Sequence, residues 1–255
     1  MFRVLDDRPG SRAAVSIARP GPLLVCAHVR ATADAADLTG LRVLLTADLL
    51  FRAAEVGGLQ VLVTRSFTGG SAGKADAERA AAALGVHPPA ADLAVARPES
   101  MAVVHVADDG GTGEDDRGGI LIRAAAARLA RDAGPGGHSE GTPGGQDPLA
   151  IRLALMSLPR HQPAELTASV LADATRTLGE WRRRVARWAE SPSGAIPKPA
   201  ADTMREAFGN LDTVAVVALL NGLAADDTLP PGPRFETFLY ADRVLGLNLP
   251  RDIGR

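Results

Sequence analysis

The first half of the chain alternates short apolar runs with longer segments in which apolar residues recur at helical spacing. An apolar run over 22–28, a helical pattern over Thr39–Val56 and a second apolar run over 59–68 follow one another. A strand, a helix and a strand in this order predict a βαβ unit with parallel strands. Because ligands bind outside the carboxyl ends of parallel strands, we expect residues 26–28 and 64–68 at a functional cleft.

The same patterns predict further elements around this unit. In chain order they are a hairpin over 1–20, a flexible glycine-rich turn at 69–73, a helix over 74–84, an extended segment over 86–98, a strand over 101–106, and a helix over 120–133 after an acidic, glycine-rich tract at 108–119. The strand over 101–106 would extend the parallel sheet.

The second half of the chain reads as helical. A stretch at 134–146, rich in glycine and proline, has the composition of a flexible linker. Asp147 and Pro148 then form a helix-start signal. The helices predicted after it cover 148–158, 164–191, 200–208, 212–223 and 234–245. We therefore predict an α/β fold with a Rossmann-like parallel sheet over 1–133, a linker over 134–147 and an all-α helical bundle over 148–255.

Composition restricts the classes of protein. Hydrophobic residues make up 46% of the chain and the net charge is −2, which is typical of a globular protein and gives no general attraction for nucleic acid. The single cysteine excludes an internal disulfide. Neither a secretory signal nor an apolar run long enough for a membrane helix is found, so we expect a cytoplasmic protein without a membrane partner.

Four segments carry a resemblance to a known family; they lie at 24–26, 47–52, 63–68 and 147–155. They resemble class I cysteinyl-tRNA synthetases and the related cysteine ligases of mycothiol biosynthesis. The last segment is the most specific, because it is nearly identical to a helix of the mycothiol ligase. The resemblance implies a nucleotide-binding core in which the residues matching Cys26 and Thr68 lie beside the amino acid substrate.

The family's catalytic groups do not carry over to this chain. The box that grips ATP phosphates with two histidines reads Leu38-Thr39-Gly40-Leu41 here. A second signature supplies two lysines, but Lys74 and Lys198, the only lysines, lie far from its place. The family's zinc site needs two cysteines, of which only Cys26 could remain. We therefore assign no catalytic or metal-binding residue, expect no zinc, and keep ATP only as an alternative.

Five residues are predicted to line a ligand site: Cys26, His28, Gly40, Thr68 and His105. Four of them also have a plainer interpretation. Cys26 fits a small buried side chain, and His28 a histidine in a surface loop. His105 fits a hydrogen-bonded core residue, and Thr68 a hydroxyl that caps the end of its strand.

Four arginines gather between two tryptophans in the predicted helix over 164–191. They are Arg182, Arg183, Arg184 and Arg187, between Trp181 and Trp188. Such a group could bind RNA by charge and stacking. A solvated helix face with the tryptophans packed inward is the interpretation we favour.

Three functional hypotheses follow from these observations. The first is a degenerate, shortened relative of cysteinyl-tRNA synthetases that is non-catalytic or repurposed and binds an aminoacyl- or adenylate-like small molecule. The second is an ATP-dependent cysteine ligase with altered motifs. The third is a structural or partner-binding module, for which the sequence identifies no protein partner. We do not expect tRNA as a partner, since the chain ends at Arg255 without an anticodon-binding domain.

Overall fold

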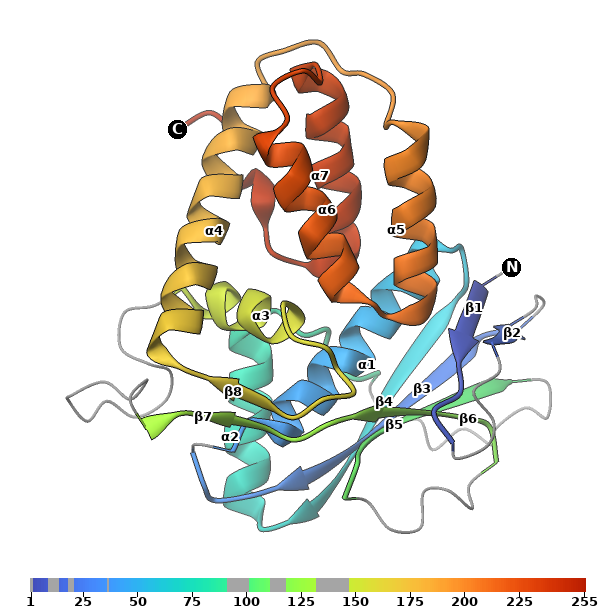
Figure 1. Ribbon diagram of the computed structural model, residues 1–255. Helices are drawn as coiled ribbons and strands as arrows, with labels where there is room; N and C mark the ends of the chain where they lie inside the picture. The colour runs from blue at the N-terminus through green and yellow to red at the C-terminus, as the bar shows by residue number, and fades with distance from the viewer. Residues whose placement is uncertain are drawn as a thin grey trace.

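Four parallel strands form the central sheet of the protein (Figure 1). The structure is a computed structural model, and it describes residues 2–8, 14–17, 21–35, 37–90, 101–110, 118–131 and 147–255. The strands are β3 (Leu23–Ala31), β4 (Val61–Gly69), β5 (Ala102–Asp108) and β6 (Ile120–Ala124), in the spatial order β4-β3-β5-β6. The predicted α/β class and the βαβ unit are confirmed, and the sheet is consistent with a Rossmann-like core.

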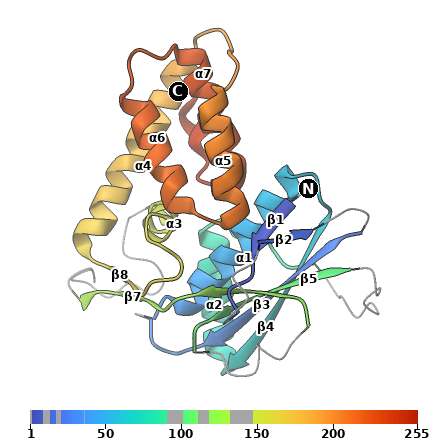
Figure 2. The same cartoon turned by 45° about the vertical axis from the view of Figure 1, so that its right-hand side comes forward.

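Helix α1 (Thr39–Val56) lies at the centre of the molecule, between the sheet and the later helices (Figure 2). It contacts all four sheet strands on one side and α5 and α7 on the other. Thirteen of its eighteen residues are buried, whereas a helix that covered only a sheet would keep a polar, exposed face. The buried surface of this helix is therefore nearly continuous around it, and it includes the polar side chains of Arg42, Thr46 and Asp48.

Five helices follow residue 147. They are α3 (Pro148–Met156), α4 (Ala168–Trp188), α5 (Lys198–Asn210), α6 (Thr213–Ala225) and α7 (Pro231–Leu245), followed by a 3-10 turn at Leu249–Asp252. The side chain of Asp147 accepts a hydrogen bond from the Leu149 amide at 3.0 Å, which confirms the predicted helix start. Helices α4, α5 and α6 each contact α7.

The tryptophans of α4 point inward, as we favoured from the sequence. Trp181 and Trp188 are buried and contact Phe238 of α7 edge-on, with ring centroids 5.7 Å and 5.1 Å apart. Arg182 is buried as well and pairs with Asp147, whereas Arg183 is exposed. The arginines of this helix therefore do not lie together on one solvent-facing surface.

The predicted N-terminal hairpin is confirmed. Strands β1 (Phe2–Leu5) and β2 (Ala14–Ile17) pair in antiparallel fashion. After β1 the chain runs along the edge of β6, where the Asp7 amide donates to the Leu121 carbonyl at 2.8 Å. The carboxylates of Asp6 and Asp7 accept from the Leu121 and Arg123 amides, so this segment protects the edge of the sheet.

The helix predicted over 120–133 is wrong. The structure has β6 there, followed by β7 (Ala127–Leu129), which pairs in parallel with β8 (Ala164–Leu166). Residues 120, 121, 122 and 124 are all buried. A strand buried on both faces carries no period-two alternation, and the run of alanines over 124–127, at its end and after it, is typical of a helix.

Two element boundaries also differ from the prediction. The segment predicted as one helix over 164–191 begins with β8, and α4 starts only after Thr167, whose hydroxyl accepts from the Val170 amide. Helix α2 (Ser71–Ala83) begins within the stretch that we predicted as a flexible turn. Gly73 permits this early start, because a Cβ there would lie 2.8 Å from the Thr32 carbonyl oxygen.

Several predicted features lie outside the described residues. They are the hairpin turn after residue 8, the extended segment beyond residue 90, most of the acidic tract and the linker over 134–146. Within the part of the chain that the structure describes, no helix combines the length and the apolarity that crossing a membrane requires.

Candidate functional site

Three of the predicted site residues, Cys26, His28 and His105, lie side by side on adjacent strands of the sheet, and Thr68 lies further toward the carboxyl end of β4. Cys26 and His28 of β3 pair in register with Thr64 and Ser66 of β4, and Cys26 pairs with His105 of β5. Because side chains alternate along a strand, these residues share one face of the sheet. The sheet order changes direction between β3 and β5, and this switch point is where open α/β sheets bind ligands.

A row of hydrogen-bonded side chains crosses this face. The Ser66 hydroxyl lies 2.7 Å from Nδ1 of His28, and Nε2 of His28 lies 2.9 Å from Nδ1 of His105. Nε2 of His105 lies 3.1 Å from the carbonyl oxygen of Gly118. We call these three side chains, Ser66, His28 and His105, the relay. Sequence reasoning missed Ser66, although its alternation with Thr64 and Thr68 on the strand could have indicated it.

The Gly118 carbonyl determines how protons are arranged along the relay. A carbonyl oxygen only accepts, so Nε2 of His105 carries a proton and, in the neutral ring, its Nδ1 is bare. In two neutral rings the proton between them then belongs to Nε2 of His28, and Nδ1 of His28 is an acceptor. With both rings neutral, the Ser66 hydroxyl donates its proton toward His28. The relay thus directs a hydroxyl group at an imidazole base.

The surroundings of the two histidines differ. His105 is 3% exposed, in agreement with a hydrogen-bonded core residue. His28 is only half-buried and lies within β3, so its interpretation as a surface-loop residue is wrong. The strand continues three residues past His28, which the apolar pattern did not show because His28 and Arg30 interrupt it.

Cys26 and Thr68 occupy different settings on the same face. The Cys26 thiol is 5% exposed, which agrees with the interpretation as a small buried side chain. Thr68 is exposed, one residue before β4 ends. Among the described residues, no three His, Cys, Asp or Glu side chains are grouped as a metal site would require. The relay residues are therefore the polar groups around which a candidate site can be built.

The N-terminus of α1 is occupied by groups of the chain itself. The amide of Leu38 and the hydroxyl of Thr39 both donate to the Ala127 carbonyl, at 2.9 Å and 3.3 Å. Leu41 is buried in the core. Gly40 lies so close to β3 that a Cβ would be 2.9 Å from Cγ1 of Val29, which explains this glycine by packing. A role of Gly40 in ligand binding stays a prediction.

Arg42, which the sequence did not single out, fixes two loops beside this helix end. Its buried guanidinium donates to the carbonyls of Gln162 at 2.7 Å and Pro159 at 2.6 Å, and to that of Ala125 at 3.1 Å. Burial lowers the pKa of Arg42, and the charge of Asp109 opposes this effect. All of these acceptors belong to the protein backbone, so this cation is engaged in the fold.

Two of the segments that carry the family resemblance meet in a buried ion pair. Nη2 of Arg152 in α3 lies 2.6 Å from the Asp48 carboxylate in α1, and both side chains are fully buried. Asp48 also accepts from Nε of Arg52 at 2.9 Å and from the His87 amide at 2.8 Å. Burial lowers the pKa of Arg152, and Asp48 counteracts it. These segments therefore join α1 to the helices that follow the sheet.

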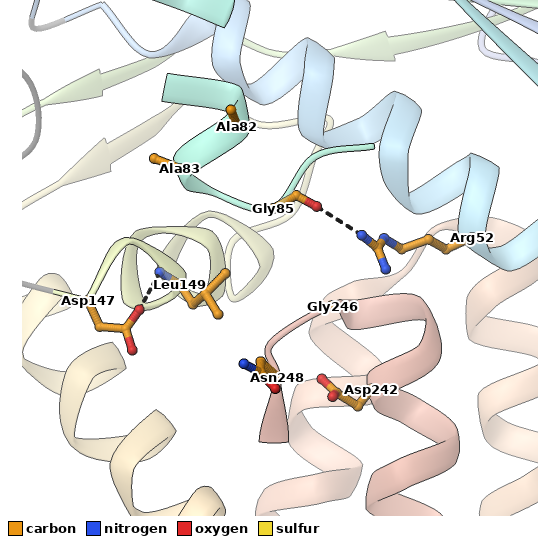
Figure 3. A pocket seen from close by; sticks show the side chains of 9 residues that line it. All are labelled: Arg52, Ala82, Ala83, Gly85, Asp147, Leu149, Asp242, Gly246 and Asn248. Atoms are coloured by element: carbon orange, nitrogen blue, oxygen red, sulfur yellow. Dashed lines mark hydrogen bonds between the residues drawn. The ribbon is translucent and has the colours of Figure 1, made fainter. Parts of the chain in front are cut away.

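Figure 3 shows a pocket of about 490 Å³ whose lining includes none of the relay residues. Arg52 from the end of α1, Gly85 after α2 and Asp242 near the end of α7 line it, together with Asp147 and Asn248. Helix α1 leads into β4 and α2 leads into β5, so the C-terminal ends of both helices lie near the amino ends of the strands. The pocket, which is lined by residues from these helix ends, therefore lies near the amino ends of the strands as well. It is thus at the opposite end from Thr68.

The two carboxylates of this pocket already have partners. Burial raises the pKa of Asp242, although the amides of Leu249 and Leu247 donate to it. Burial also raises the pKa of Asp147, but hydrogen bonds, that from Arg182 first, bring this pKa below its usual value. A second cavity of about 670 Å³ shares Arg52 with the first.

Comparison with known proteins gives partial relatives. No family model matches the chain. A protein of Acidothermus cellulolyticus is 30% identical over 105 residues, which is 41% of this chain and 25% of that protein. One of Kribbella flavida is 35% identical over 106 residues, 41% of this chain and 25% of that protein. One of Streptomyces scabiei is 39% identical over 82 residues, 32% of this chain and 19% of that protein.

All three relatives bear the name L-cysteine:1D-myo-inositol 2-amino-2-deoxy-alpha-D-glucopyranoside ligase. The chain is partially homologous to cysteine ligases. The matches span between 19% and 25% of the length of these relatives, so their whole-protein activity does not transfer directly. The similarity agrees with the resemblance of the sequence to the mycothiol cysteine ligases, which are class I cysteinyl-tRNA synthetase-like enzymes.

Proposed function

We propose that this protein is a shortened, repurposed relative of cysteine ligases that binds a small aminoacyl- or adenylate-like ligand and does not activate cysteine with ATP. The ligand would bind at the carboxyl ends of β3, β4 and β5. We also propose that the sheet and its helices are a reduced synthetase core and that α4–α7 act as the helical bundle that supports it.

The state of the α1 N-terminus is the observation that carries this proposal. In the family this region grips ATP phosphates with two histidines, and here leucines stand at 38 and 41. Leu41 is packed in the core, and the polar groups of Leu38 and Thr39 bond to Ala127. Without cations aimed at the phosphates, the transition state of phosphate displacement loses its main stabilisation.

The sheet face beside β3 supports retention of a ligand. Thr68 is exposed there, and the relay adds a hydroxyl and imidazoles near the strand ends. A few polar groups at the switch point of a parallel sheet are typical of small-molecule sites. The half-buried apolar side chain of Leu38, where the family has a histidine, favours a partly apolar ligand over a triphosphate.

The proposal is tested by measuring activation and binding separately. We expect no cysteine-dependent ATP–pyrophosphate exchange above background. In thermal-shift assays we expect stabilisation by cysteine or by a non-hydrolysable cysteinyl-sulfamoyl adenylate, and none by ATP alone. Thr68→Val should weaken that stabilisation, while Thr228→Val, an exposed threonine in the turn before α7, should leave it unchanged.

Two other outcomes would favour the remaining hypotheses. The names of the relatives favour an active ligase, and measurable pyrophosphate exchange would establish it in place of our proposal. A protein that responds to none of these compounds would instead favour a structural or partner-binding role.

A further inference from the structure

We propose that Ser66 is a nucleophile that His28 activates, and that the protein catalyses hydrolysis or transfer of activated acyl esters through an acyl-serine. Nothing in the comparisons assigns such an activity. A nucleophile within hydrogen-bond reach of a base, with the base oriented by a third group, is the structural signature of covalent catalysis. The three distances of the relay, 2.7 Å, 2.9 Å and 3.1 Å, fit that signature.

The direction of the hydrogen bonds carries this argument further than the distances. Because the Gly118 carbonyl can only accept, Nε2 of His105 carries a proton, and with both rings neutral Nδ1 of His105 accepts from Nε2 of His28 and so sets the His28 tautomer. That tautomer presents a bare Nδ1 to the Ser66 hydroxyl. A base in the opposite tautomer could not remove the hydroxyl proton, so His105 is a positioning residue for His28.

Exposure along the relay falls in the order that such chemistry requires. The Ser66 side chain is exposed, His28 is half-buried, and His105 is 3% exposed. An ester can therefore approach the hydroxyl, while the orienting imidazole stays shielded from water. Arg30 lies two residues beyond His28 on the same face and pairs with the Asp108 carboxylate at 3.4 Å. Its side chain is 59% exposed, so the donors that Asp108 does not take are the nearest cationic groups to which a developing oxyanion can turn.

The reaction proceeds in two balanced halves. Oγ of Ser66 bonds to the ester carbonyl carbon while its proton moves to Nδ1 of His28. The tetrahedral oxyanion then breaks the bond to the leaving-group oxygen, which takes that proton from His28 and departs as an alcohol. Water repeats the sequence on the acyl-serine, so the acid is released and Ser66 is restored. No oxidant, metal or nucleotide is required.

The test uses the full-length protein and 4-nitrophenyl acetate, an activated ester with a chromophoric alcohol. We expect a burst of 4-nitrophenol, and intact-mass and peptide analysis should place one acetyl group on Ser66. Ser66→Ala should abolish both the burst and the label. His28→Gln should lower the acylation rate by a factor on the order of a hundred, the usual size of a general-base contribution.

Matched variants separate catalysis from a merely structural role. Ser66→Cys should restore acylation, because a thiol next to the same base is a better nucleophile. His105→Gln, which keeps an acceptor for His28, should acylate faster than His105→Leu when both have the same melting temperature. Ser16→Ala and His87→Gln, which change an exposed serine and an exposed histidine outside the relay, should leave the burst unchanged.

The outcomes also distinguish this inference from the proposed function. Acetylation elsewhere, or equal rates in Ser66→Ala and the unmodified protein, would overturn the inference and show that the relay only satisfies polar groups of the sheet. The assay uses neither ATP nor an aminoacyl ligand. Failure to bind cysteine compounds would therefore remove the proposed function and leave acylation of Ser66 intact.

Discussion

At Arg152, one buried guanidinium meets acceptors from three separate parts of the chain. It donates to the Leu245 carbonyl at 2.5 Å, to the Leu84 carbonyl at 3.1 Å and to the Asp48 carboxylate at 2.6 Å. Leu245 is the last residue of α7, Leu84 directly follows α2, and Asp48 lies within α1. A buried cation that is satisfied in this way fixes how the elements around it are oriented.

We expect Arg152→Met to destabilise the protein by about 3–5 kcal/mol, since it leaves Asp48 buried without its main counter-charge. Urea unfolding followed by circular dichroism measures this loss. The control is Arg176→Met, which breaks an exposed pair with Asp173 and should cost less than about 1 kcal/mol. Arg152→Lys should recover only part of the loss, because an ammonium group cannot reproduce the planar fork. Equal stability of the Met and control variants would contradict this account.

The relay shows what the sequence could and could not supply at this scale. His28 and His105 were identifiable as polar residues near strand ends, and His105 as a core residue. Their contact with each other and with Ser66 depends on β3 lying between β4 and β5, and no local pattern states that order. The burial of Arg42 and Arg152 could not be predicted either. In the sequence, an arginine whose guanidinium donates to buried backbone carbonyls cannot be told from an exposed arginine of a helix.

Among the elements, those with strong periodicity or clear end signals were predictable. The βαβ unit, the hairpin and the start of α3 at Asp147 follow directly from apolar runs and a capping residue. Strand β6 and the short strands β7 and β8 were missed, since β6 is buried at four of its five positions and so shows no alternation, and three residues are too few to define a period. Their pairing comes from distant segments, which only the folded chain brings together.

Helix α2 provides a test of how closely elements approach. We expect Gly73→Ala to destabilise the protein by about 1–3 kcal/mol, although alanine is the better helix former, because the new Cβ would lie 2.8 Å from the Thr32 carbonyl oxygen. Gly222→Ala in α6 is the matched control. No atom lies within 4 Å of its Cβ position, so this change should stabilise the protein by about 1 kcal/mol. Thermal melts of both variants measure the difference, and a stabilising Gly73→Ala would show that α2 does not press on the Thr32 loop.

For the whole molecule, the contacts of α1 bear on the predicted division into two domains. The helix contacts every strand of the sheet and also α5 and α7, and its Asp48 pairs with Arg152 beyond the predicted linker. Separate domains usually meet through smaller and more polar interfaces. The buried all-round surface of α1 instead favours one continuous core, although the domain boundaries themselves stay a prediction.

We therefore expect the sheet and the later helices to unfold in a single transition. The chain contains two native probes for this test, since both tryptophans lie in α4 and the only cysteine lies in β3. Tryptophan fluorescence reports on the helices, while the reaction of Cys26 with a thiol reagent reports on the sheet. In urea the two curves should coincide, as a cooperative unit requires. Exposure of Cys26 at a lower urea concentration than the fluorescence change would establish two independent domains. Arg152→Met provides the internal control. If the packing of α1 couples the sheet to the helices, this change should shift both unfolding curves to lower urea by the same amount. If the Asp48–Arg152 ion pair were the only coupling, the two curves of the variant would no longer coincide.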